Sequence, residues 1–124
     1  MRQGAVPPSD HRASVEWAVT FDEFRASLKR GTKPPAGLSA PLRALWLEGK
    51  GDWAAAHGTV DDLETKEAAH VHAYLHRAEG DRDNARYWYG RAGVRPATNA
   101  FAGEWEELVR ALLGESDSAR HSRD

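Results

Sequence analysis

The sequence predicts an all-α domain of about six helices, and three observations support this prediction. Apolar residues recur at intervals of three and four in several segments between Phe21 and Leu112, which is the spacing of one helix face. The chain holds 21 Ala and seven Val but no Ile, so it lacks the β-branched runs of a sandwich or barrel. One segment also repeats without gaps after 29 residues, as helical hairpins do.

Residues that start and stop helices define the expected elements. Thr20 followed three residues later by Glu23 is a capping box, which predicts a first helix over residues 21–29. A Pro-rich linker over residues 33–41 is expected to join this helix to the repeats. Cap residues and helix-breaking glycines predict four further helices, over residues 40–48, 53–60, 65–79 and 82–91. An apolar face at helical spacing predicts a last helix over residues 101–113.

The helical pattern covers only the middle of the chain. Residues 1–15 combine Gly, Pro and scattered charges without an apolar period, so we expect a flexible arm. Residues 115–124 are polar and are expected to form a disordered tail. A single helical domain is therefore predicted over residues 16–114.

Composition and charge exclude several functional classes. The formal net charge of −2 argues against nucleic acid as a partner. No apolar stretch approaches the roughly 18 residues of a membrane span, and the start of the chain does not resemble a signal peptide. The absence of Cys excludes disulfides and thiolate chemistry, while 13 Arg against four Lys are typical of a GC-rich bacterial genome. We expect a bacterial, cytoplasmic protein that binds neither nucleic acid nor a membrane.

The internal repeat has a geometric meaning. Residues 44–52 followed by Ala56 align with residues 73–81 followed by Ala85, and both copies carry Gly-Asp between two helices. Gly permits the first helix to end in a left-handed conformation, and Asp caps the second helix. The small Ala side chains let the two helices approach closely. Each copy is therefore predicted to form an αα-hairpin.

This repeat resembles the tetratricopeptide repeat. The family's characteristic positions are matched in the second hairpin by Gly80, Asp81, Ala85, Tyr89 and Ala92. The first hairpin matches less well, and the period of 29 is shorter than the family's length of about 34. The resemblance implies two tetratricopeptide-like hairpins with single flanking helices, and a groove that recognises a peptide or protein.

A second resemblance covers roughly residues 34–113. Residues 45–57 and 71–89, with the pattern AYLHRxEGDxxNARYWYxRAG, are similar to a family of small bacterial helical proteins of unknown function. This similarity implies a small helical domain and adds no particular activity.

Histidines concentrate in the middle of the chain. His72 and His76 are four residues apart in a predicted helix, so they share one face. This spacing suits two imidazoles that bind one transition-metal ion such as zinc, and His57 could supply a third ligand from the preceding helix. The alternative is a set of buried, hydrogen-bonded histidines that have a structural role.

An aromatic residue and two arginines form a second candidate surface. Helical geometry places Tyr87 outward and Trp88 and Tyr89 toward the core. Tyr87 with Arg77 and Arg91 could line an exposed face, and this composition is frequent in binding hot spots. The alternative is an ordinary solvated face.

The remaining aromatic and acidic residues have structural explanations. Trp46, Trp53, Trp88 and Trp105 are expected in the core, and Trp17 before the first helix is expected to be a staple or an exposed anchor. The carboxylates at positions 104, 106 and 107 lie at a helix start, where they interact favourably with the macrodipole. The chain contains no nucleophile elbow, phosphate loop or dinucleotide fingerprint, so no catalytic residue is predicted and an enzyme is disfavoured.

The leading functional hypothesis is a non-catalytic helical domain that recognises a peptide or protein. Its candidate binding residues are His57, His72, His76, Arg77, Tyr87 and Arg91. One alternative is a metal- or small-ligand-binding protein, catalytic or not, that uses His57, His72 and His76. Another alternative is a structural subunit that covers the apolar ends of the hairpins in a homodimer.

Overall fold

The computed structural model describes residues 19–114, and this part of the chain contains six α-helices and no strand. The all-α prediction is confirmed. The expected arm, the expected tail and Trp17 lie outside the described residues. The helices are α2 (Phe21–Arg30), α3 (Ala40–Gly49), α4 (Trp53–Val60), α5 (Lys66–Glu79), α6 (Arg82–Ala92) and α7 (Phe101–Leu113).

Local side-chain caps explain where α2 to α6 begin, whereas α7 starts after Ala100 without one. The Thr20 hydroxyl accepts a hydrogen bond from the backbone N–H of Glu23, and the Glu23 carboxylate accepts one from the backbone N–H of Thr20. The side chains of four other residues accept the corresponding bond at the starts of α3 to α6: Ser39, Asp52, Thr65 and Asp81. These bonds satisfy backbone donors that have no partner inside a helix.

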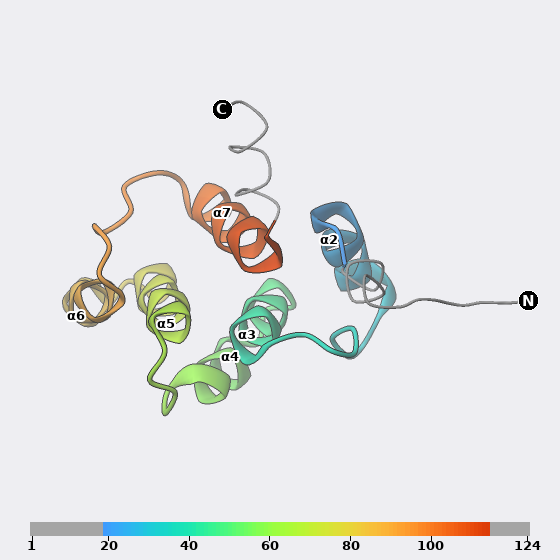
Figure 1. Cartoon of the computed structure of the whole chain (residues 1–124), viewed down its shortest axis with the longest axis horizontal. Helices are drawn as coiled ribbons and strands as arrows, with labels where there is room; N and C mark the ends of the chain where they lie inside the picture. Colours follow the sequence, from blue (N-terminus) through green and yellow to red (C-terminus); the bar gives the residue numbers. More distant parts are fainter. Residues whose placement is uncertain (1–18, 115–124) are drawn as a thin grey trace, which may run out of the picture.

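The helices form two adjacent pairs and two flanking elements (Figure 1). α3 packs against α4 and α5 packs against α6, each pair joined by a short turn. Figure 1 shows α6, α5, α4 with α3, and α2 in a curved row, with α7 on its inner side. α7 contacts α2, α3 and α5 and thereby closes the row. The likeness of the two pairs to tetratricopeptide hairpins stays a prediction.

The glycines of the repeat occupy the backbone region that the repeat predicts. Gly51 and Gly80 have φ angles of +88° and +93°, which L side chains rarely adopt. Each glycine is followed by the Asp that caps the next helix. In the second copy Gly80 caps the end of α5, and in the first copy Gly51 follows Lys50, which caps the end of α3.

The core contains a few aromatic residues and many alanines. Trp46 is fully buried, and its Nε1 donates a hydrogen bond to the Ser27 Oγ at 2.8 Å. Trp105 contacts Phe21 and Phe24 and donates to the Leu45 carbonyl oxygen at 3.0 Å. These contacts join α2, α3 and α7 into one core. The other predicted core tryptophans are only half-buried: Trp53, Trp88 and Trp105.

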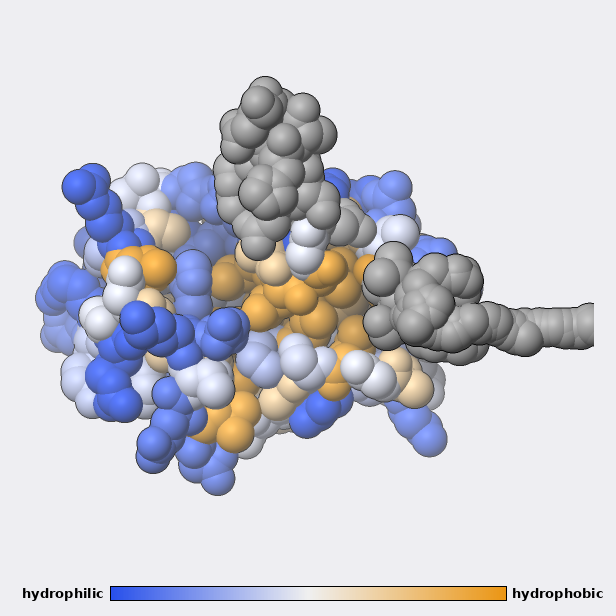
Figure 2. Space-filling model, in the orientation of Figure 1, coloured by the Kyte–Doolittle hydropathy of each residue, from blue (hydrophilic) through white to orange (hydrophobic). Residues whose placement is uncertain are grey.

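The surface of the described region carries both hydrophilic and apolar residues. Figure 2 shows hydrophilic residues over α5 and α6 and a group of apolar residues over α7. Within residues 19–114, no helix has the length and apolar character that crossing a membrane requires.

Candidate metal centre

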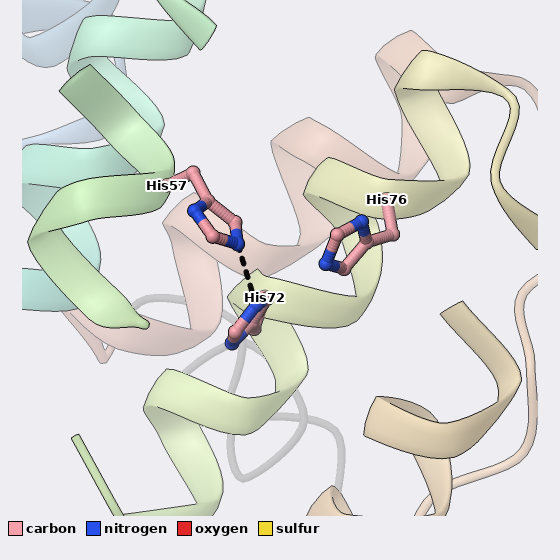
Figure 3. A group of neighbouring side chains, drawn as sticks. All are labelled: His57, His72 and His76. Carbon is pink, nitrogen blue, oxygen red and sulfur yellow. Dashed lines mark hydrogen bonds between the residues drawn. The ribbon is translucent and has the colours of Figure 1, made fainter. Parts of the chain in front are cut away.

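Three histidines from two helices converge between α4 and α5. Figure 3 shows His57 on α4 facing His72 and His76 on α5. The Nε2 atoms of His57 and His72 are 2.9 Å apart, and one ring nitrogen from each of the three residues lies within 4.8 Å of the others. The structure therefore brings together all three residues of the predicted metal-ligand set.

Two tryptophans hold this histidine cluster, which consists of His57, His72 and His76. The Trp53 ring stacks on His57 with 4.8 Å between centroids, and its Nε1 donates to the Leu75 carbonyl oxygen at 2.7 Å. This bond ties the start of α4 to α5. Trp88 on α6 stacks on His72 with 3.9 Å between centroids. The sequence predicts both tryptophans in the core, but they are half-buried and stack against the outer faces of the histidine cluster.

Carboxylates lie on the outer side of two of these rings. The Glu79 Oε2 is 3.0 Å from the Nδ1 of His76, and an Asp61 oxygen is 3.8 Å from the Nδ1 of His57. When the Nδ1 of His76 donates to Glu79, its Nε2 keeps a lone pair for a metal ion. Such carboxylate–imidazole pairs orient histidine ligands in many metal sites.

The environment of His72 favours the neutral ring. Burial, together with the smaller effects of the nearby His57 and His76 rings, lowers its pKa to about 4. A neutral imidazole is the form that binds a metal ion. The buried Nδ1 of His72 also has no hydrogen-bond partner among residues 19–114.

The His57–His72 contact is within a few tenths of an ångström of the ligand spacing in a zinc-class site. Tetrahedral bonds of roughly 2.0–2.1 Å place two ligand nitrogens about 3.3 Å apart. The His57–His72 separation of 2.9 Å would have to open by a few tenths of an ångström. His57 is the most accessible of these three, with 26 % of its side chain exposed, so it can move and leave a path to solvent.

A second possible ligand group shares His76 with two carboxylates. Ligand atoms of His76, Glu79 and Asp81 also lie within 4.8 Å of one another. However, both carboxylate oxygens of Asp81 accept hydrogen bonds from Asn84 as it caps α6. Asp81 is thus engaged in the helix turn, and the three imidazoles form the better donor set.

The structure separates the remaining predicted binding residues into two places. Tyr87 is 54 % exposed, and Arg91 lies over its ring and donates to its hydroxyl at 2.9 Å. Arg91 also lies over Trp88, the wall of the histidine cluster. The prediction that Arg77 shares this exposed face is wrong, because its side chain is only 16 % exposed and turns toward α7.

Arg77 belongs to a second buried polar group that sequence reasoning missed. Its Nη1 donates to the Glu104 Oε1 at 2.7 Å, and the Tyr89 hydroxyl donates to the Glu104 Oε2 at 2.6 Å. His70 lies 3.8 Å from the same carboxylate, and burial lowers its pKa against the opposing effect of Glu104. We call Arg77, Tyr89 and Glu104, with His70 beside them, the Glu104 network.

The explanation of Glu104 by the helix macrodipole alone is therefore incomplete. Only 2 % of this residue is exposed. One signal could have found it: Glu104 precedes the buried Leu108 by four residues and so lies on the same face of α7. Glu106 and Glu107 lie on other sides of the helix and stay more exposed.

Comparison of the chain with models of protein families, with curated proteins and with solved structures gave no match. The similarity of residues 71–89 to a family of small bacterial helical proteins therefore stays a prediction. What this protein does has to be inferred from the geometry of its own side chains.

Proposed function

We propose that this protein binds a transition-metal ion of the zinc class through His57, His72 and His76. The observation that carries the proposal is the convergence of three imidazole nitrogens from two helices within 4.8 Å. Imidazole is a preferred ligand of zinc, copper and nickel. Three protein ligands would leave one position of a tetrahedral ion for water or a small ligand.

The surroundings of the histidine cluster support a metal site over a purely structural one. Neutral imidazole has one donor and one acceptor, and His72 places its Nε2 against the Nε2 of His57. Two Nε2 atoms that face each other at 2.9 Å share one proton at most, whereas an ion between them would bind the lone pairs of both.

Neighbouring side chains orient the three rings before any ion binds. Trp53 and Trp88 stack on His57 and His72, and Glu79 is within hydrogen-bonding distance of His76. Ligands that are already oriented lose little conformational entropy on binding. The arrangement therefore favours an affinity well above that of three histidines on a mobile surface.

Metal binding can be tested on full-length protein without a His tag, treated with a chelator and then titrated with zinc. We expect one zinc per chain by elemental analysis after dialysis. A hundredfold excess over Kd stabilises the folded state by about 2.7 kcal/mol. For a domain of this size, the melting temperature should rise by roughly 10 °C or more.

His57→Gln and His70→Gln form a matched pair of variants for this titration. Both histidines are half-buried, but only His57 belongs to the histidine cluster. His57→Gln should abolish the thermal shift, whereas His70→Gln should keep it. The proposal fails if the wild type binds less than stoichiometric zinc, nickel or copper, or if both variants respond alike.

Recognition of a peptide or protein is the second candidate function. The observation that favours it is the exposed Tyr87–Arg91 pair, since an aromatic ring held by an arginine is a common interface anchor. A partner retained by the wild type should be lost by Tyr87→Ala with Arg91→Ala, while the variant keeps its helical circular dichroism. Equal retention of that partner by the double variant would exclude this surface.

A further inference from the structure

A pocket of about 600 Å³ lies on the side of α6 that faces the connection to α7. Four positions of α6 that share one helix face line it: Arg82, Ala85, Arg86 and Tyr89. Its opposite wall comes from residues 96–98 and Phe101, and Arg77 at the end of α5 closes one side. The volume falls in the range of small-molecule sites.

All of the charged side chains that line this pocket are positive. Three arginines line it, and none of its lining residues is acidic. Arg77 is oriented by Glu104 and by the carbonyl oxygen of Asn99, so its guanidinium is fixed at the rim. A cleft with several cations attracts an anion by focusing the electrostatic field.

Two of the arginines are available to a ligand. Among residues 19–114, Arg82 has no hydrogen bond or ion pair. Arg86 pairs only with Asp83 of its own helix, at 2.7 Å, and both side chains are largely exposed. Exposed pairs of this kind contribute at most about 1 kcal/mol, so an oxyanion can replace Asp83.

The apolar part of the pocket indicates what the anion is attached to. Phe101 is 50 % exposed, and the Arg77 guanidinium lies 4.8 Å from its ring centroid. Its ring is therefore held in position at the rim while one side stays accessible. Pro96, Ala97 and Ala85 continue this apolar surface into the pocket.

We infer that this pocket binds a small aromatic oxyanion, a phosphate or carboxylate, with Arg82 and Arg86 as the anion-binding residues. The guanidinium groups bind the oxyanion through charge-assisted hydrogen bonds. The ligand's aromatic ring packs against Phe101 and the neighbouring apolar residues. This site is separate from the histidine cluster and does not depend on a metal ion.

The test is a titration of the isotope-labelled full chain, followed by NMR, with phenyl phosphate, benzoate, inorganic phosphate and benzyl alcohol. We expect saturable shifts at residues 82–89 and 96–101 with phenyl phosphate or benzoate, and the tighter of the two identifies the anion. Benzyl alcohol, which lacks the charge, should bind at least tenfold more weakly. Inorganic phosphate should also bind at least tenfold more weakly, because it lacks the ring.

The double variant Arg82→Gln with Arg86→Gln should weaken binding of the aromatic anion at least tenfold. Arg43→Gln, a change at an exposed arginine of α3 outside the pocket, should leave it unchanged. Both arginines are exposed, so the double variant is expected to fold. Equal binding by wild type and double variant, or shifts outside the pocket, would overturn the inference.

Discussion

The histidine cluster and the Glu104 network are two buried polar groups on different sides of α5, and they differ in how completely they are satisfied. In the Glu104 network, the carboxylate accepts bonds from the Arg77 guanidinium and the Tyr89 hydroxyl. In the histidine cluster, His72 has a buried nitrogen without a partner in residues 19–114. Charge is paired in the first group, whereas in the second the neutral ring of His72 meets two other imidazoles.

This difference separates a structural group from a binding group. A buried charge pair with matched donors stays stable without any further component, but it does not tolerate the loss of a partner. A cluster of imidazoles with an unsatisfied nitrogen loses little when that ring is removed, and a metal ion that binds the imidazole lone pairs stabilises it. Four changes test this contrast.

Glu104→Ala should have the largest effect. It leaves the Arg77 charge and the Tyr89 hydroxyl without their acceptor in a buried position. Removing one partner of a buried ion pair costs about 3–5 kcal/mol, which is a large share of the stability of a small domain. Urea unfolding measures this cost. A loss below about 1 kcal/mol would mean that the network is not structural.

Lowering the pH should destabilise the metal-free protein through His72. Its pKa falls from 6.5 to about 4 on folding, so between these values the unfolded chain binds more protons than the folded one. The stabilising contribution is complete above pH 6.5 and is lost as the pH falls toward 4. We expect a loss of roughly 2–3 kcal/mol, measured by urea unfolding after chelator treatment.

The matched comparison for this pH series is His72→Leu, which has no titrating group at the same position. The difference in stability between wild type and variant should change between pH 6.5 and 4. If the two proteins lose stability in parallel over this range, His72 does not titrate as its burial requires.

Tyr89→Phe should have an intermediate effect. The change removes one hydrogen bond to a charged acceptor, while the Arg77–Glu104 pair stays in place. Hydrogen bonds to charged groups contribute about 1.5–3 kcal/mol, and Phe keeps the volume of the ring. Thermal and urea unfolding should both report this loss. If the variant is as stable as the wild type, the Arg77–Glu104 ion pair alone accounts for the stabilising effect of the network.

His72→Leu should have the smallest effect on the metal-free protein at pH 7, within about 1 kcal/mol. The variant removes the unsatisfied nitrogen and fills the same space with an apolar side chain. Its zinc-dependent thermal shift should be absent. A loss above about 3 kcal/mol without metal would show that the histidine cluster is itself part of the stabilising core.

The helices and their starts could be predicted from sequence because their causes are local. The cap at Asp81 and the left-handed turn at Gly80 depend on residues within one helical turn. The pairing of His72 with His76 follows from their spacing alone. Even the participation of His57 was predicted, since α4 and α5 are adjacent in the chain.

What could not be predicted depends on how the helices rotate against one another. The spacing from Leu108 puts Glu104 on the apolar face of α7, but its burial and its pairing with Arg77 depend on the packing of α7 against α5. The same contact turns Arg77 away from Tyr87. The place of Trp53 and Trp88 at the edge of the core, beside the histidines, likewise depends on the pairing of α4, α5 and α6.

The adjacency of His76 and Arg77 constrains the motion of α5. Neighbouring helix residues point about 100° apart, so one residue faces the histidine cluster while the next faces α7. Because Arg77 is anchored to Glu104 and to the backbone of Asn99, α5 cannot roll about its own axis without breaking a buried charge pair. The ion pair on one side of α5 thus prevents rotation of the helix and keeps the imidazoles on the other side facing His57.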